Sequence, residues 1–375
     1  MLNIPGKEMP RFRLRLLCWF AVCKRDLPWR RTRDPYRIWL SEIMLQQTRV
    51  AAVIPYYRRF LENFPDVQTL AGAETDLVLT NWAGLGYYSR ARNLQRAAQE
   101  IVSRHAGEFQ REYEAALALP GIGRYTAAAV LSIAHGAPHA VLDGNVARVI
   151  ARIAAVRGDL RAPATWWKLQ ATAQELLAPD SAGDWNQAMM ELGATVCTPK
   201  APRCWQCPAE EWCRARQLGI QGSIPAARKK RATVKVTLAA AVLLDPHGHT
   251  LLVRQSGGDG DLFSHMWQFP ALETIGKTGI SALAAYLRKK FGVAVNGSFS
   301  GKGKGNVKPL AAARHAVTFR NIRLEPYLIH ISKLPRAKGM HTVSLAKVPE
   351  MSISNATRKI ATAAIASQRP AVTNH

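Results

Sequence analysis

The sequence has no long hydrophobic run and few acidic side chains. None of its apolar stretches approaches the roughly 18 residues that a membrane-spanning helix needs, and residues 1–15 lack the hydrophobic centre of a signal peptide. We therefore predict an intracellular protein without membrane contact. With 48% hydrophobic residues in a chain of 375, wholesale disorder is excluded and two or three domains are expected.

Negative charge is scarce and unevenly spread. The chain carries 51 Lys and Arg against 26 Asp and Glu, which gives a net charge of +25. Residues 51–200 are neutral overall, whereas residues 1–50 carry +7 and residues 201–375 carry +18. A neutral middle between basic flanks is typical of a catalytic core that its neighbours hold against a polyanion. A basic protein without a polyanionic partner is the alternative.

Cysteines are also few, but four of the six are clustered in a C-x6-C-x2-C-x5-C spacing. These four are Cys197, Cys204, Cys207 and Cys213. In an intracellular protein such a cluster indicates a metal site rather than disulfides. Four thiolates suit zinc or an iron–sulfur cluster, and the asymmetric spacing slightly favours [4Fe–4S].

Hydrophobic periodicity predicts two kinds of structure. Apolar residues recur every three or four positions in residues 11–220, which predicts helices within 36–60, 77–102, 125–133, 146–156 and 166–177. Beyond a basic linker at 221–233 the period changes, which predicts strands at 234–244, 250–254 and within 315–331, a helix at 280–291 and a loop at 297–305. We therefore expect a mainly α region at 1–220 and an α+β domain at 234–375.

The segment Leu119-Pro-Gly-Ile-Gly-Arg-Tyr-Thr-Ala127 places two glycines directly before a helical run. Gly121 and Gly123 allow a tight turn and leave free N–H groups at a helix N-terminus, where they can bind an anion such as one DNA phosphate. Such a contact reads no base sequence. An ordinary turn between two helices is the alternative, but the L-P-G-x-G form matches the helix-hairpin-helix motif and favours DNA.

Two carboxylates have the features of an acid and its ionised partner. Glu42 lies on a mainly apolar helical stripe, where burial would raise its pKa and make it a general acid near neutral pH. Asp143 comes just before a helical run, a position that keeps a carboxylate ionised. Cleavage of an N-glycosidic bond needs this pair, one group to protonate the leaving base and one to stabilise the sugar cation. A salt-bridged Glu42 and a purely helix-capping Asp143 are the alternatives.

These segments resemble the endonuclease III superfamily of DNA glycosylases, and more specifically the MutY family of adenine DNA glycosylases. The resemblance extends from about residue 11 to Cys213 and includes residues 41–49, 82–90 and 142–146. In this family the cysteine spacing holds a [4Fe–4S] cluster, here at 197–213. Tyr125 stands where strand-cleaving members have a lysine, so the resemblance implies base removal without strand cleavage, because a phenol forms no imine.

The resemblance also implies a role for each matching residue. Glu42 would protonate adenine N7 after the base has flipped out of the duplex, and Asp143 would stabilise the sugar cation. Tyr125 and Asn145 would line the catalytic site. The adenine pocket would include Leu27, Trp29, Arg30 and Gln187, and the contacts with the duplex around the mispair would include Gln47, Thr48, Tyr87 and Tyr88.

From about residue 234 the sequence resembles the Nudix-like domain that recognises 8-oxoguanine in this family, most clearly at 266–270. A Nudix hydrolase needs R-E-x-x-E-E-x-G to hold Mg²⁺, but residues 285–292 read A-Y-L-R-K-K-F-G. We therefore expect this domain to bind without hydrolysing nucleotides. The family's Phe-Ser-His loop is Val-Thr-Phe at 317–319, which leaves the Thr318 hydroxyl as the group expected to contact the oxidised base.

Together these observations predict a helix-hairpin-helix glycosylase region with a [4Fe–4S] module followed by a Nudix-like α+β domain. The predicted protein is a monomeric, monofunctional enzyme of base excision repair. Its expected substrate is double-stranded DNA with adenine opposite 8-oxoguanine or guanine, and its expected location is the cytoplasm, at the nucleoid if bacterial. The alternatives are a glycosylase for another mismatched base, disfavoured because pyrimidines lack N7, and a non-catalytic iron–sulfur protein that senses DNA damage.

Overall fold

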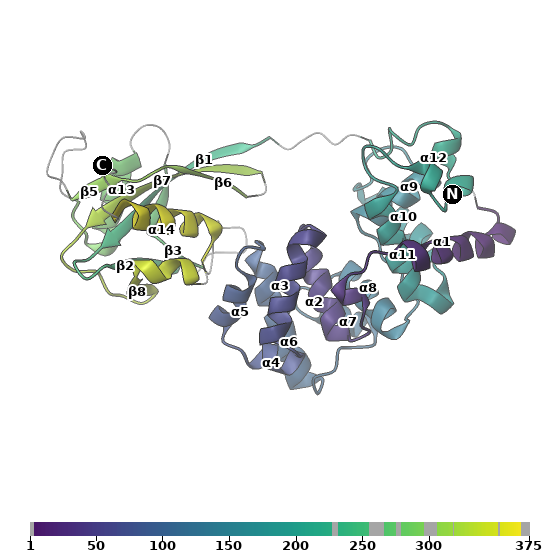
Figure 1. The fold of residues 1–375 in the computed structure, drawn as a ribbon, viewed down its shortest axis with the longest axis horizontal. Helices are drawn as coiled ribbons and strands as arrows, with labels where there is room; N and C mark the ends of the chain where they lie inside the picture. Colours follow the sequence, from purple (N-terminus) through teal and green to yellow (C-terminus); the bar gives the residue numbers. More distant parts are fainter. Residues whose placement is uncertain are drawn as a thin grey trace, which may run out of the picture. The chain divides into compact units, whose positions relative to one another are not determined.

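The computed structural model describes residues 4–226, 232–254, 266–274, 279–295, 306–317, 319–351 and 353–368. The chain divides into two compact units. The helical unit comprises Met1–Ala73 and Arg90–Lys229, and the sheet unit comprises Glu74–Ser89 and Lys230–His375 (Figure 1). The sequence analysis placed Glu74–Ser89 in the mainly α region at 1–220. The structure groups this segment with the sheet unit instead.

The described residues of the helical unit form helices joined by short turns. The α-helices are α1 (Met9–Cys23), α2 (Pro35–Leu45), α3 (Val50–Asn63), α4 (Val67–Gly72), α6 (Tyr88–Arg104), α7 (Tyr113–Ala118), α8 (Arg124–His135), α9 (Gly144–Ile153), α10 (Pro163–Leu176), α11 (Ala182–Thr195) and α12 (Arg214–Gln217). The predicted mainly α class is therefore confirmed. Among the described residues no helix is both long and apolar enough to cross a membrane.

The periodic stretch at 36–60 is interrupted between α2 and α3. Gln47 has a φ of +57° there. The guanidinium of Arg90, on α6, donates through Nη1 to the carbonyl oxygens of Ile43, Met44 and Gln46 at 2.7, 3.1 and 2.5 Å. These carbonyls have no partner within α2, so Arg90 ends the helix by satisfying them. The periodic stretch at 77–102 is also interrupted, between α5 (Thr75–Trp82) and α6.

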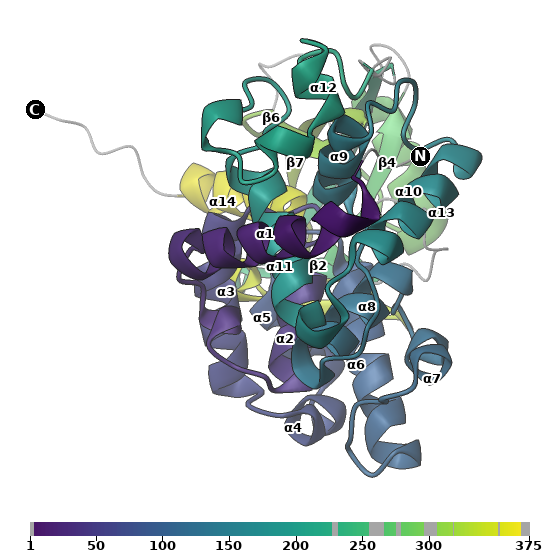
Figure 2. The ribbon, with the colours of Figure 1, turned by 90° about the vertical axis from the view of Figure 1, so that its right-hand side faces the viewer.

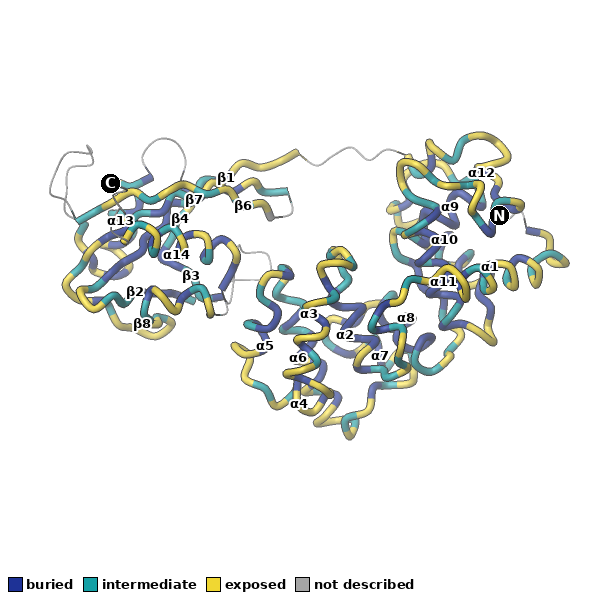
Figure 3. Tube along the Cα trace, viewed as in Figure 1, coloured by how far each residue is buried: buried dark blue, intermediate teal, exposed yellow. Residues whose placement is uncertain are grey.

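The core of the helical unit lies around α2, α8 and α11. Figure 3 shows α2 and α8 largely buried, and Figure 2 shows α1 crossing α11, against which it packs. Two glycines let α11 approach its neighbours closely. A Cβ at Gly183 would lie 2.6 Å from the carbonyl oxygen of Ser132 on α8, and a Cβ at Gly193 would lie 2.7 Å from Cβ of Asn145 on α9. The backbone of α11 therefore touches both helices.

The described strands of the sheet unit form one mixed sheet in the order β3-β2-β1-β7-β5, with β4 beside β1, β6 beside β7 and β8 beside β2. The strands are β1 (Val234–Leu244), β2 (His249–Arg254), β3 (Trp267–Gln268), β4 (Ala271–Thr274), β5 (Val307–Pro309), β6 (Ala313–Val317), β7 (Arg320–His330) and β8 (Met340–Ser344). The central pair β1 and β7 is parallel, and its register runs from Val234 opposite Arg320 to Leu244 opposite His330.

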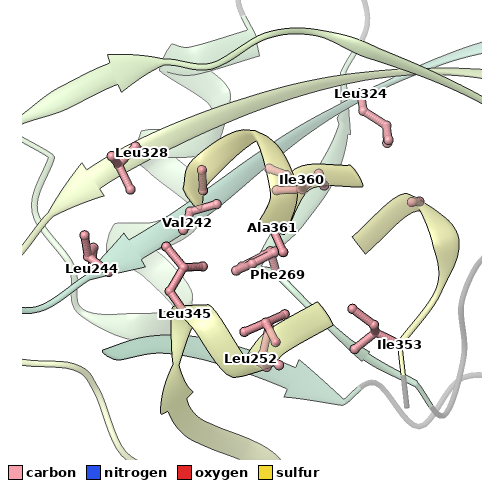
Figure 4. Close-up of a cluster of buried hydrophobic side chains, with 14 of the residues drawn as sticks. Val242, Leu244, Leu252, Phe269, Leu324, Leu328, Leu345, Ile353, Ile360 and Ala361 are labelled. Carbon is pink, nitrogen blue, oxygen red and sulfur yellow. The ribbon is translucent and has the colours of Figure 1, made fainter. Parts of the chain in front are cut away.

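Both faces of this sheet are covered by a helix. On one face Val242 and Leu244 pack with Ile360 and Ala361 of α14 (Asn355–Gln368), as Figure 4 shows. On the other face Ala241 and Leu243 pack with residues of α13 (Gly279–Phe291). Because both faces of β1 are buried, the strand reads as a continuous apolar run rather than an alternation. The α+β class is confirmed, and α14 is a helix that the sequence analysis did not predict.

Two predicted features of the sheet unit lie outside the described residues: the loop at 297–305 and Thr318. The altered Nudix segment 285–292 occupies the second half of α13, where Lys289 and Lys290 are exposed.

Candidate active site

A pocket of about 480 Å³ in the helical unit collects most of the predicted site residues. Its lining includes Leu27, Trp29, Arg30, Glu42, Gln47, Thr48, Tyr125, Asp143, Asn145 and Gln187. These side chains come from the turn before α2, from α2 and the turn after it, and from the N-terminal turns of α8 and α9 and the middle of α11. Predicted residues as far apart in the sequence as Leu27 and Gln187 thus line one cavity.

Glu42 is buried at the wall of this pocket, with 6% of its surface exposed. Its hydrogen-bond partner is the hydroxyl of Tyr125, which donates to Oε2 at 2.7 Å. Burial raises the pKa of Glu42 to about 7, against the opposing effect of the Tyr125 hydrogen bond, and the nearby Asp143 raises it further. A carboxyl group with this pKa is partly protonated at neutral pH and can act as a general acid.

Asp143 is the N-cap of α9. Its Oδ1 accepts hydrogen bonds from the backbone N–H groups of Asn145 and Val146 at 2.9 and 2.7 Å, and the Asn145 amide donates to Oδ2 at 3.1 Å. Burial raises the pKa of Asp143 above its usual value, while these hydrogen bonds oppose the shift by stabilising the carboxylate. The capping role and a catalytic role are thus compatible, because the cap fixes the orientation of both oxygens.

Arg148 holds the first turn of α9 in place. Its Nη2 donates to Oδ1 of Asn145 at 2.9 Å and to the carbonyl oxygen of Gly193 at 2.8 Å, and its Nε donates to the carbonyl oxygen of Cys197 at 2.9 Å. The Asn145 side chain is therefore fixed at both ends, by Asp143 and by Arg148.

Sequence reasoning missed an ion-pair network in the same pocket. Glu191, completely buried on α11, accepts two hydrogen bonds from the side chain of Arg25 at 2.7 Å and one from Arg30 at 2.8 Å. Burial alone would raise the pKa of Glu191, but these two guanidinium groups outweigh it and lower the pKa to about 2. A signal was present in the sequence, since Glu191 is the one charged residue between positions 185 and 199.

The predicted hairpin joins α7 to α8 beside α6. Gly121 has a φ of +75°, and a Cβ there would lie 2.6 Å from Cβ of Asn93, so both conformation and space require glycine. Gly123 is the N-cap of α8, has no capping side chain, and faces open space. The N-terminal amides of α8 are therefore accessible to an anion.

Gln47 and Tyr87 share an uncommon backbone conformation. Both have positive φ values, +57° and +49°, and both side chains are exposed. Left-handed backbone is uncommon for residues other than glycine and is found often at functional sites. Tyr87 and Tyr88 lie in Glu74–Ser89 and thus in the sheet unit, where the Tyr88 hydroxyl donates to the carbonyl oxygen of Ile353 at 3.3 Å.

The four clustered cysteines line one small cavity of about 20 Å³. None forms a disulfide. Burial raises the pKa of Cys207 to about 12, and the charges of the other three thiols raise it as well, which indicates that the four sulfur atoms lie near one another. No group of three or more His, Cys, Asp or Glu side chains in the described ranges is arranged to hold a single metal ion.

A buried arginine adjoins this cavity. Arg152, 1% exposed, has its Nη1 3.3 Å from Sγ of Cys197, and its other hydrogen bonds go to the carbonyl oxygens of Ile224, Thr198 and Pro199. A buried cation needs a compensating negative charge. Four thiolates around one cavity can supply it, so the donor set and its surroundings fit an anionic metal–sulfur group.

Known proteins are similar to this chain mainly over the helical unit. Residues 40–179 match the family model described as "HhH-GPD superfamily base excision DNA repair protein". The human protein named adenine DNA glycosylase is 49% identical over 219 residues, which cover 56% of this chain and 40% of the human one. The Arabidopsis thaliana protein of the same name is 35% identical over 328 residues, covering 76% and 51%.

A solved structure titled as a thermostable thymine-DNA glycosylase is similar to the helical part, with 28% identity and a TM-score of 0.53 over 58% of this chain and 100% of that one. The chain spans about half the length of these curated relatives.

Replacing Glu191 by glutamine should destabilise the helical unit by roughly 3–5 kcal/mol, because it leaves two arginines facing the pocket without a carboxylate. The ion pairs of Glu191 stabilise the fold above the carboxyl's unfolded pKa of 4.5 and weaken as pH falls toward about 2. In the variant the free energy of unfolding should therefore no longer contain the decrease that protonation of Glu191 causes at acid pH. Urea unfolding followed by circular dichroism at several pH values measures both effects.

The matched control is Asp184→Asn, which removes an exposed ion pair with Arg33 at 3.3 Å and should cost less than about 1 kcal/mol. Equal stability losses in the two variants would contradict the assigned role of Glu191.

Proposed function

Because residues 40–179 belong to the HhH-GPD superfamily of base excision DNA repair proteins, we propose that this chain is a DNA glycosylase that releases adenine. The observation that carries the proposal is one pocket holding a protonatable Glu42 and a hydrogen-bonded Asp143. This is the pair of groups that hydrolysis of an N-glycosidic bond requires.

Glu42 is the general acid of this reaction. With a pKa of about 7, a large share of the molecules carry its proton at neutral pH. Tyr125 occupies Oε2 and so leaves Oε1 for adenine N7. Protonation at N7 withdraws electrons from the glycosidic bond and turns the base into a better leaving group. Asp143, with its Oδ1 held by two backbone amides, stabilises the positive charge that develops on the sugar. A water molecule then adds to C1′ of the sugar cation and loses a proton, which completes the hydrolysis.

The pocket is suited to a planar base that has left the duplex. Trp29 and Leu27 supply apolar walls, and Arg30 and Gln187 supply hydrogen-bonding groups at its edge. Gln47 and Tyr87 are both exposed and have left-handed backbone. We assign them to contacts with the DNA duplex around the mispair. Gly121 and Gly123 bind a phosphate of the same duplex. Tyr125 carries no amine, so the product is an abasic site in an unbroken strand.

The substrate is double-stranded DNA with adenine opposite 8-oxoguanine or guanine. We assign recognition of the opposite base to the sheet unit as a Nudix-like domain, in which residues 285–292 offer no carboxylates for Mg²⁺. Thr318, assigned to the oxidised base, lies outside the described residues. The predicted domain limits, the monomeric state and the cytoplasmic location belong to the same proposal.

Cys197, Cys204, Cys207 and Cys213 would hold a [4Fe–4S] cluster. The group would supply a structural cross-link that fixes residues 197–213, and no step of base release passes through it. The support is the set of four free thiols around one cavity and the buried Arg152 beside it.

Two other functions fit some of these observations. Similarity to a thymine-DNA glycosylase structure favours a pyrimidine substrate, but a protonated Glu42 has no N7 to act on in thymine. A non-catalytic damage sensor would not need the raised pKa of Glu42 or an ordered Asp143. Adenine release therefore explains more of the pocket than either alternative.

Glu42→Gln should abolish adenine release while leaving DNA binding within about threefold of the native chain, because glutamine keeps the shape but carries no transferable proton. Single-turnover assays on duplexes with adenine opposite 8-oxoguanine, guanine or thymine, read with and without alkali, measure this. Breakage that depends on alkali identifies an abasic product.

Three results would count against the proposal. Strand breakage without alkali would mean lyase chemistry, release of thymine would mean another base specificity, and tight binding without any release in the native chain would favour the damage sensor.

The rate of adenine release should fall as pH rises above about 7, where Glu42 loses its proton, by about tenfold per pH unit. On the acid side it should fall where Asp143 gains a proton, at a pH above that of an ordinary aspartate because its pKa is raised. Tyr125→Phe should move the basic midpoint upward, since the hydroxyl lowers the pKa of Glu42. A flat pH profile, or an unchanged midpoint in Tyr125→Phe, would contradict the assignment of Glu42.

Chain purified and reconstituted without oxygen should contain about four iron and four acid-labile sulfide per molecule. Cys207→Ser should lower both, since it removes one of four thiolates, whereas Cys18→Ser, an exposed cysteine on α1, should leave them unchanged. Elemental analysis and visible absorption measure the content. One zinc per chain, or the same iron content in both variants, would refute the cluster.

A further inference from the structure

A second cavity lies against the other side of α2 within the helical unit. It has a volume of about 330 Å³ and shares no residue with the catalytic pocket. Pro35, Tyr36 and Trp39 of α2 line this cavity, whereas Ile38, Glu42 and Leu45 line the catalytic one. Its remaining walls come from Asp34, from residues 66–68, from Ile101 of α6, from residues 107–109 and Arg111, and from His135 at the end of α8. We call it the α2 back pocket.

Two buried polar atoms of residues lining the back pocket have no hydrogen-bond partner within the part of the chain described: Nε1 of Trp39 and Nε2 of His135. The Trp39 side chain is only 1% exposed, so its N–H group has lost contact with bulk water. Leaving such a group unsatisfied costs about 1–3 kcal/mol, and proteins avoid it unless something else supplies the partner. Two orphaned groups around one cavity indicate a partner that is not part of the chain.

The shape of the lining also favours a flat, largely apolar ligand. The rings of Trp39 and Phe109 lie with centroids 5.7 Å apart, and Tyr36, Val67 and Ile101 extend the apolar wall. Aromatic and aliphatic walls with a few convergent polar atoms are typical of pockets for small planar ligands. A volume of about 330 Å³ lies at the small end of the range for ligand pockets and is sufficient for a bicyclic ring system.

The charge of the lining selects against anions. The lining includes three carboxylates, those of Asp34, Asp66 and Glu108, and one arginine, Arg111. Even when Arg37 is counted, which pairs with Asp34 at 3.3 Å, carboxylates outnumber guanidinium groups. This is unusual in a chain with a net charge of +25. Burial and the charge of Arg111 lower the pKa of His135, which leaves its imidazole neutral near pH 7 and able to accept a hydrogen bond.

We propose that the α2 back pocket binds a small, planar, neutral or cationic nitrogen heterocycle. A ring nitrogen of the ligand accepts a hydrogen bond from Trp39 Nε1, and a ligand N–H group donates to His135 Nε2. Phosphorylated ligands and DNA are excluded by the carboxylates. The proposal does not depend on the function of the catalytic pocket, since the two cavities have no lining residue in common.

The test uses benzimidazole, which carries one ring N–H and one acceptor nitrogen, with the full chain labelled with ¹⁵N at its tryptophan indoles. The signal of the Trp39 indole N–H is the one absent from the NMR spectrum of Trp39→Phe. As benzimidazole is added, the chemical shift of this signal should change until the site is saturated. Indene, with nearly the same shape but no nitrogen, should bind at least about tenfold more weakly, the equivalent of about one hydrogen bond. Benzimidazole-5-carboxylate should also bind more weakly, because of the acidic lining.

Variants separate this site from the catalytic one. Trp39→Phe keeps the aromatic wall and removes the donor, so it should weaken benzimidazole binding about tenfold by calorimetry. His135→Leu, at the half-exposed end of α8, tests the acceptor independently if Trp39→Phe does not fold. Glu42→Gln alters only the catalytic pocket and should leave the affinity unchanged.

The proposal is overturned if benzimidazole does not shift the Trp39 resonance up to its solubility limit, or if indene binds as tightly. It is equally overturned if Glu42→Gln removes binding while Trp39→Phe and His135→Leu retain it, because the ligand would then occupy the catalytic pocket.

Discussion

The hydrogen bond between Tyr125 and Glu42 is the contact on which the chemistry of this molecule depends. It joins α8 to α2 across the wall of the pocket and places a carboxyl group where water has little access. Burial raises the pKa of that carboxyl more than the hydroxyl lowers it, and the balance falls near 7. A more exposed glutamate would be ionised, and a glutamate without the tyrosine would hold its proton too firmly. Both helices must therefore stay in fixed positions.

The close packing of α11 provides that fixed frame. Gly183 and Gly193 allow its backbone to touch α8 and α9, and this brings Glu191 to the pocket wall. Glu191 then binds Arg25 and Arg30, which orders the segment before α2. Arg148 links the same helix to Asn145 and so to Asp143. One helix thus positions residues on three sides of the pocket, although only a few of its side chains face it.

The sequence revealed features whose residues lie close together along the chain, and it did not reveal contacts between residues that are far apart along it. Glu42, Asp143 and the two hairpin glycines stand in short continuous motifs, so the pattern and the family resemblance located them. The strand Val234–Leu244 was predicted because a doubly buried strand leaves a clear apolar run. The interruption at Gln47 was missed because Arg90, more than 40 positions away, causes it. The Arg25–Glu191 pair was missed for the same reason, since its partners are 166 residues apart.

The turn at Gln47 has an evolutionary consequence. Arg90 holds this turn through carbonyl oxygens of the main chain, which every amino acid possesses. The conformation is therefore largely independent of the side chain at position 47, apart from β-branched residues, which tolerate a positive φ poorly. Selection can alter what this exposed position presents to a partner with little loss of stability. At such a turn, a substitution can change recognition while the fold is retained.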